Sequence, residues 1–325
     1  MPPVDPQGRT INYLRLSVTD RCNLRCSYCM PENGISKITH NEVLSYEDLY
    51  RIARAAVAIG IDKIRITGGE PLVRKGIIGF LQQLADIPGL GQLVLTTNGV
   101  LLEEMAAELR AAGVKRLNIS LDTLNPETFA RISRCDSLKR VLAGIQMAKD
   151  YGFPIKLNMV VMRGINDHEI LDFAELATNS ATTVRFIEYM PAIREYNWQG
   201  LVVPGTEILK RLAQRYTLLP LEHAEAAGPA RNFRIPGAPG IIGVITPVSH
   251  HFCSECNRIR VTATGQAKGC LFSESRIDLK QSLHENSDVL LTRALAEVID
   301  TKPLQHQMST EECHHQAFSM SSIGG

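Results

Sequence analysis

Three cysteines stand close together near the start of the 325-residue chain, at Cys22, Cys26 and Cys29. Their thiolates could bind one metal centre from a single loop. Structural zinc sites normally close with four ligands, and an iron–sulfur cubane needs one ligand for each of its four irons. Because a fourth cysteine is missing locally, the spacing favours a cubane whose last iron stays open to an external ligand. A zinc site completed by a distant histidine such as His40 is the alternative.

A second triplet lies near the other end of the chain. It consists of Cys253, Cys256 and Cys270. Residues Arg258–Thr262 and Lys268–Phe272 flank the turn sequence Ala-Thr-Gly-Gln and predict a β-hairpin, which would bring Cys256 and Cys270 together. The pattern favours a second open cubane that could bind substrate, with zinc or structural thiols as the alternatives.

Two cysteines have no partner at ligand spacing. Free cysteine is commonly a small buried hydrophobic residue, and we expect this of Cys135 and Cys313. Metal binding by Cys313 together with His314 and His315 is the alternative.

The elements that must position the first triplet alternate between strand and helix. Apolar, β-branched runs predict six strands at Tyr13–Val18, Lys63–Ile66, Leu93–Leu95, Arg116–Ile119, Ile155–Val161 and Val184–Ile187. Capping signals and apolar stripes predict helices after Ser45 and Asn125, and over Leu102–Ala112, Leu138–Tyr151 and Glu169–Thr178. This order predicts a parallel sheet with right-handed crossovers.

The first strand helps to choose between a partial α/β barrel and a doubly wound sheet. Leu14 and Leu16 point to one face, while Arg15 and Ser17 point to the other, because side chains alternate along a strand. A polar inner face favours a partial barrel around a ligand cavity.

Polar or glycine-rich segments follow five of the predicted strands. They are Asp20-Arg21-Cys22, Thr67-Gly68-Gly69-Glu70-Pro71, Thr96-Thr97-Asn98-Gly99, Ser120-Leu121-Asp122 and Glu188-Tyr189-Met190. The carboxyl ends of parallel strands form the site in α/β folds, so these segments predict one shared pocket; five ordinary turns are the alternative.

The strand–helix pattern stops after Met190. Residues Gly228–Gly240 are rich in glycine, proline and alanine and predict a linker. A smaller C-terminal region follows, with a helix expected at Leu290–Ile299.

Composition excludes several classes of protein. The 35 basic and 34 acidic residues sum to a net charge of +1, and 6% of residues are aromatic, so a basic, ring-stacking nucleic-acid module is disfavoured. No segment predicts a membrane span, and the N-terminus has no apolar core of a signal peptide. With few, clustered cysteines, we expect a cytoplasmic protein.

The two triplets and their surroundings resemble a known family. The first triplet followed by Gly68-Gly69-Glu70-Pro71 is similar to the radical S-adenosylmethionine (SAM) enzymes. The longer strings at 14–31 and 65–72, the second triplet and the terminal Gly324-Gly325 resemble the GTP 3′,8-cyclases of molybdenum cofactor biosynthesis. The resemblance implies an N-terminal tail (1–10), a partial (β/α)6 barrel (11–190) and a C-terminal region with a second cluster (191–325).

The resemblance also implies the chemistry and its cofactors. Two [4Fe-4S] clusters would be held by the triplets, and SAM bound at the first would yield a 5′-deoxyadenosyl radical. The radical would take hydrogen from C3′ of GTP, and C3′ would then bond to C8 of guanine.

Individual residues acquire roles through the same resemblance. The SAM contacts would be Tyr28, Gly69, Ser120 and Met190. The GTP contacts would be Arg15, Arg65, Thr96, Lys156, Arg258, Ile259 and Arg260. The tail Gly324-Gly325 would insert into the pocket near Arg15. Arginine forks suit a triphosphate, and Arg258 and Arg260 face one side of their predicted strand, although solvated surface charges are the alternative.

The resemblance further implies an external electron donor, a homodimer, and transfer of the product to cyclic pyranopterin monophosphate synthase. Two other functions compete with the cyclase. One is a radical SAM enzyme acting on a peptide, and the other is a zinc-stabilised module that binds nucleic acid.

Overall fold

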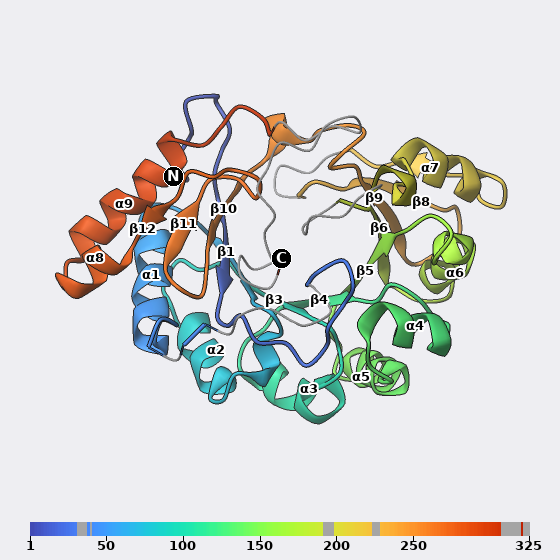
Figure 1. Cartoon of the computed structure of the whole chain (residues 1–325), viewed down its shortest axis with the longest axis horizontal. Helices are drawn as coiled ribbons and strands as arrows, with labels where there is room; N and C mark the ends of the chain where they lie inside the picture. The colour runs from blue at the N-terminus through green and yellow to red at the C-terminus, as the bar shows by residue number, and fades with distance from the viewer. Residues whose placement is uncertain (31–37, 40, 191–197, 223–227, 307–319, 321–325) are drawn as a thin grey trace.

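The computed structural model describes residues 1–30, 38–39, 41–190, 198–222, 228–306 and 320. Its strands form one curved sheet with helices along the outer side (Figure 1). The six expected strands are confirmed as β1 (Tyr13–Ser17), β2 (Lys63–Thr67), β3 (Gln92–Thr97), β4 (Arg116–Ser120), β5 (Ile155–Val161) and β6 (Thr183–Glu188). They are parallel and adjacent in chain order, which confirms the partial barrel.

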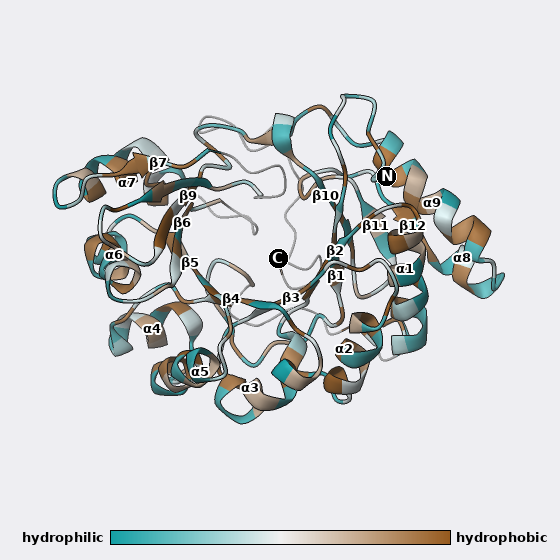
Figure 2. Ribbon diagram, turned by 180° about the vertical axis from the view of Figure 1, so that it is seen from behind, coloured by the Kyte–Doolittle hydropathy of each residue, from teal (hydrophilic) through white to brown (hydrophobic). Residues whose placement is uncertain are grey.

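The outer helices cover the apolar face of this sheet. They are α1 (Tyr46–Ala58), α2 (Ile77–Ala85), α3 (Leu102–Ala111), α4 (Pro126–Ser133), α5 (Leu138–Asp150) and α6 (Ile170–Asn179). Teal and brown residues alternate along these helices in Figure 2, as the apolar stripes require. Ser45 and Asn125 accept the expected capping hydrogen bonds from Asp48 N and Thr128 N, at 3.0 and 2.9 Å.

The alternation along β1 is also confirmed. Leu14 and Leu16 are fully buried in the core, whereas Arg15 faces the inside of the barrel. Helix α2 was not predicted, although Ile77, Phe80 and Leu84 provide its apolar stripe. No helix in the described part of the chain is both long and apolar enough to cross a membrane.

The C-terminal region continues the barrel, so the expectation that the pattern stops after Met190 is wrong. Helix α7 (Gly205–Ala213) follows β6, and β9 (Ile241–Ile245) then pairs parallel to β6. The expected linker Gly228–Gly240 contains a strand, β8 (Arg231–Arg234), which pairs with β7 (Leu219–Pro220) and β9. The strand is short, and its sequence Arg-Asn-Phe-Arg contains no apolar, β-branched run, so local composition did not indicate it.

At the edge of the sheet next to β1, strands from the N-terminal and C-terminal parts of the chain pair with each other. Strand β10 (Arg258–Val261) lies parallel to β1, and the predicted hairpin is confirmed by its antiparallel pairing with β11 (Gln266–Lys268). Strand β12 (Ile277–Asp278), helix α8 (Lys280–His284) and helix α9 (Asp288–Asp300) complete this edge, beside α1 in Figure 1.

A buried carboxylate ties the other edge together. The carboxylate of Glu188, at the end of β6, accepts hydrogen bonds from the backbone nitrogens of Gly205 at 2.6 Å, Val248 at 3.1 Å and Ser249 at 3.0 Å. It also contacts the Ser249 hydroxyl. One side chain thus fixes the start of α7 and the loop after β9 to the barrel.

We predict that Glu188→Gln lowers the free energy of unfolding by about 2–3 kcal/mol, because an amide group would place a donor against several backbone donors. The comparison variant is Glu104→Gln, at the exposed Arg140–Glu104 pair, which should leave stability almost unchanged. Anaerobic urea denaturation followed by circular dichroism measures both. Equal stability of the two variants would contradict the role given to Glu188.

Candidate functional site

A cavity of about 380 Å³ occupies the inside of the partial barrel. Residues from both ends of the sequence line it, which confirms the shared pocket expected at the strand ends. The cysteines of both triplets are among them: Cys22, Cys26, Cys29, Cys253, Cys256 and Cys270.

The first triplet lies on the loop after β1. This loop is held against the end of α4, because Arg25 N donates to Ser133 O at 3.0 Å and Ser27 N donates to Ile132 O at 2.9 Å. A tight turn then places Cys29, whose backbone nitrogen donates to Cys26 O at 3.0 Å. The loop therefore brings all three cysteines to the wall of the cavity.

The segment after β2 packs directly against this loop. Gly69 N donates to Thr19 O at 2.7 Å, and a Cβ on Gly69 would stand 2.7 Å from Asp20 O, so only glycine allows this approach. The buried carboxylate of Glu70 accepts from Leu72 N, Thr97 Oγ1 and Asn98 N. Burial raises the pKa of Glu70 to about 7.

The second triplet lies at the opposite end of the strands, near the amino end of β10. Cys253 and Cys256 stand on a turn just before β10, and the hairpin register that pairs Arg260 with Lys268 brings Cys270 to the same end. Since β10 runs parallel to β1, the amino end of β10 is remote from the loop that follows β1. The two triplets therefore meet the cavity from opposite ends.

The sulfur positions discriminate between a cluster and a zinc ion. Two thiolates bound to one tetrahedral zinc at 2.3 Å would lie about 3.8 Å apart. Within the described residues, only His251, Cys253 and His306 bring three ligand atoms within 4.8 Å of one another. Neither cysteine triplet is that compact, so each fits a larger multi-iron group better than a single ion. Because His251 and His306 lie beside Cys253, a zinc ion would compete with a cluster at this cysteine.

The thiols differ in how readily they ionise. Burial raises the pKa of Cys22 to about 11 and also raises the pKa values of Cys26 and Cys253. Burial acts in the same direction on Cys256, but the Arg258 guanidinium and the Lys302 ammonium outweigh it and lower its pKa to about 6. Cys256 is thus prepared to act as a thiolate ligand at neutral pH.

Cations surround the part of the cavity next to the second triplet. Strand register places Arg65 and Arg260 directly beside Arg15, one on each neighbouring strand. Burial and Arg65 lower the pKa of Arg15 to about 9, while burial and Arg185 lower the pKa of Lys156 to about 6. These cations repel one another. An anion bound among them would offset the repulsion, because a nearby opposite charge favours the protonated form of a base.

Sequence reasoning missed three of these cations. Lys63, Arg116 and Arg185 also line the cavity. Within the described residues none of the three forms an ion pair, and Nε of Arg116 and Arg185 has no hydrogen-bond partner. Alternation was the available signal, since Arg185 stands between the core residues Val184 and Phe186 on β6.

The opposite end of the cavity carries acidic groups. Tyr28, on the cysteine loop, donates from Oη to Asp122 Oδ2 at 2.7 Å, and Val160 N donates to Asp122 Oδ1 at 2.9 Å. Burial raises the pKa of Asp122 to about 6. The cavity is therefore polarised, with carboxyls near the first triplet and cations near the second.

The remaining predicted residues are distributed unequally. Thr96, Ser120 and Met190 line the cavity beside the residues named above. Ile259 does not, because its side chain alternates away from Arg258 and Arg260 and packs in the hydrophobic core.

Some predicted residues lie outside the described part of the chain. They are His40, Cys313, His314, His315, Gly324 and Gly325. The described residue Met320 lines the cavity. Cys135 is half-buried, packs against the core and lies 3.3 Å from Ser137 Oγ, in keeping with a packing role.

Comparison with known proteins divides the chain into two matches. Residues 16–177 match the Radical SAM superfamily, and residues 182–308 match the family described as Molybdenum Cofactor Synthesis C. Among solved structures, Streptococcus suis SuiB bound to S-adenosylmethionine has a TM-score of 0.60 at 14% identity, over 90% of this chain and 64% of that one. This likeness supports the fold.

Close relatives match the chain over almost its whole length. GTP 3′,8-cyclase of Geobacter sulfurreducens is 62% identical over 323 residues, covering 99% of both chains. GTP 3′,8-cyclase of Peptoclostridium acidaminophilum is 47% identical over 325 residues, covering 99% of this chain and 98% of that one. With both cysteine triplets facing one cavity, these matches show that the chain belongs to the GTP 3′,8-cyclase family of radical SAM proteins.

Proposed function

We propose that this protein converts GTP to 3′,8-cyclo-7,8-dihydro-GTP, the first step of molybdenum cofactor biosynthesis. One observation carries the proposal: two cysteine triplets enter a single cavity from opposite ends, with buried cations beside the second. We call the first triplet and its neighbours the first half-site; it lies within residues 11–190 and would bind SAM. The second half-site contains the second triplet and the buried cations, is completed by residues 191–325, and would bind a nucleoside triphosphate.

The first half-site would hold a [4Fe-4S] cluster on Cys22, Cys26 and Cys29. When bound there, the cluster supplies the electron that cleaves SAM to methionine and a 5′-deoxyadenosyl radical. The proposed SAM contacts Tyr28, Gly69, Ser120 and Met190 support this role, because strand ends and close loop packing bring all four to the same cavity.

The second half-site would hold GTP. A triphosphate carries about four negative charges, and forked guanidinium groups bind phosphate oxygens in pairs. The proposed contacts that line the cavity are Arg15, Arg65, Thr96, Lys156, Arg258 and Arg260, and Lys63, Arg116 and Arg185 are added from the structure. Ile259 stays in the proposal through the family resemblance alone, since its side chain packs in the core. Cys253, Cys256 and Cys270 would hold the second [4Fe-4S] cluster, next to the guanine ring.

The protein's main contribution is to position and enclose the reactants. A carbon radical takes hydrogen from most C–H bonds, so the ribose C3′ has to lie closest to it and water has to be kept out. Triphosphate binding at one end and SAM binding at the other would align C3′ between them. The buried residues of the cavity wall, such as Arg65 and Arg185, would keep water from the sides of the bound reactants.

Four wider features belong to the same proposal. An external electron donor, a homodimer and transfer of the product to cyclic pyranopterin monophosphate synthase rest on the family resemblance, and a cytoplasmic location rests on the cysteine usage. The C-terminal Gly324-Gly325 would complete the cavity, and the position of Met320 in its lining supports this.

The direct test is anaerobic incubation of the reconstituted protein with SAM, dithionite and GTP. We expect 5′-deoxyadenosine to form in step with the loss of GTP, from protein holding about eight irons in two clusters. The matched variant C253A/C256A/C270A should cleave SAM weakly and leave GTP unchanged. Stoichiometric zinc in place of iron, or unaltered GTP turnover by the variant, would refute the proposal.

A second prediction concerns Arg185, which sequence reasoning missed. We expect Arg185→Met to weaken GTP binding about tenfold or more, since one charge-assisted contact of about 1.5–3 kcal/mol is lost. Guanosine, which has no phosphate, should bind equally to both proteins. The surface variant Arg215→Met serves as the control for anaerobic calorimetry. Equal weakening of GTP and guanosine would place Arg185 away from the triphosphate.

A third prediction concerns the end of the chain. Deleting Gly324 and Gly325 should leave the iron content and the unfolding transition unchanged but abolish cyclisation, because the tail would complete the substrate pocket. Iron analysis, thermal denaturation and product chromatography measure these effects. Normal GTP turnover by the shortened chain would show that the tail has no part in the reaction.

A further inference from the structure

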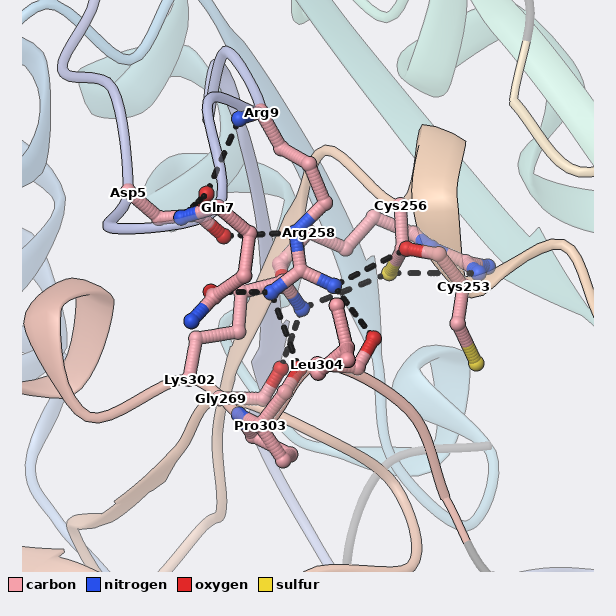
Figure 3. Close-up of polar contacts among 10 residues, drawn as sticks. All are labelled: Asp5, Gln7, Arg9, Cys253, Cys256, Arg258, Gly269, Lys302, Pro303 and Leu304. Atoms are coloured by element: carbon pink, nitrogen blue, oxygen red, sulfur yellow. Dashed lines mark hydrogen bonds and ion pairs between the residues drawn. The ribbon is translucent and has the colours of Figure 1, made fainter.

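Lys302, just beyond α9, lies buried beside the second cysteine triplet. Its ammonium donates to Cys256 Sγ at 3.4 Å, to Arg258 O at 3.0 Å and to Gly269 O at 2.6 Å (Figure 3). An ammonium has three N–H donors, so every one of them is used. The acceptors flank the hairpin: one is a cysteine of the triplet, and Gly269 directly precedes another, Cys270.

In the described part of the chain, the positive charge of Lys302 lies next to cysteine sulfur and not next to a carboxylate. A buried ammonium is costly unless an opposite charge accompanies it. Among the described residues Lys302 forms no ion pair with a carboxylate. Burial, Arg9 and Arg258 oppose the charged form of Lys302, whereas the sulfur atoms of Cys256 and Cys270 favour it. The lysine therefore matches a site that carries negative charge on sulfur.

The backbone that carries Lys302 is fixed independently. Arg9 Nη1 donates to Leu304 O at 3.1 Å and to Cys253 O at 2.9 Å, and Arg9 Nη2 donates to Pro303 O at 2.9 Å. Asp5 pairs with Arg9 Nε at 2.6 Å, and both side chains are buried. Figure 3 shows the Arg9 guanidinium between Asp5 and the backbone of Pro303 and Leu304. The N-terminal stretch is thus a packed support for the second triplet.

We propose that Lys302 is a positioning residue for the second cluster, which donates a hydrogen bond to the Cys256 thiolate and stabilises the reduced, more negative state of the cluster. Hydrogen bonds to sulfur and nearby charge are among the main determinants of cluster potential. The inference rests on the proposed function in one respect only, namely that the second triplet holds a cluster.

The test measures the reduction potential of the second cluster in the full-length chain. The background C22A/C26A/C29A leaves that cluster as the one iron–sulfur group to be titrated, followed by the electron paramagnetic resonance signal of its reduced state. We expect Lys302→Met to shift the midpoint to a more negative potential, because the positive charge and the hydrogen bond are both lost. Lys302→Arg, which keeps the charge, should shift it less.

Lys210→Met is the matched control. Lys210 is an exposed lysine on α7, at the other edge of the sheet, so the same loss of one charge there should leave the potential near that of the parent. An unchanged potential in Lys302→Met, or an equal shift in the control, overturns the inference and leaves the proposed function standing. If Lys302→Met loses its iron, retention by Lys302→Arg supports the inference and equal loss overturns it. A parent without iron overturns both proposals.

Discussion

Backbone hydrogen bonds between β1 and β10 join the two halves of the site. This pairing makes residues nearly 250 positions apart in sequence into neighbours, with Arg15 beside Arg260. It also sets the position of the second triplet. Because β10 runs parallel to β1, it begins at the end of the barrel that is remote from the first cysteine loop. Without this register the two triplets would not enter one cavity from opposite ends.

The same pairing creates an electrostatic problem that a ligand would relieve. Like charges on directly adjacent strand positions repel, and burial adds a desolvation cost to each of them. Arg15, Arg65 and Arg260 occupy such positions, and their pKa values are all lowered by burial. A polyanion bound among them would neutralise the group. The unfavourable burial of these like charges therefore supports a binding role for this part of the barrel.

At the acidic end of the cavity, hydrogen bonds hold the buried groups in place. Glu70 and Asp122 are each held by backbone and side-chain donors, so they serve as rigid connections between loops. Glu70 joins the glycine-rich segment to β3, and Asp122 joins the cysteine loop to β5 through Tyr28 and Val160. The end proposed for SAM is thus shaped by hydrogen bonds, and the end proposed for GTP by charge.

Local sequence was sufficient wherever the signal was local. Cysteine spacing, the capping residues Ser45 and Asn125, and the alternation along β1 predicted which cysteines gather at the cavity, where two helices start and which face of β1 lies inside the barrel. The neighbours of Arg15 on β2 and β10, the gathering of Arg116 and Arg185 around one cavity, and the contact of Lys302 with Cys256 depended on pairing between distant segments. Only the tertiary structure decided them, because backbone hydrogen bonds select partners in space, and a residue's charge has no defined effect until its neighbours and its burial are known.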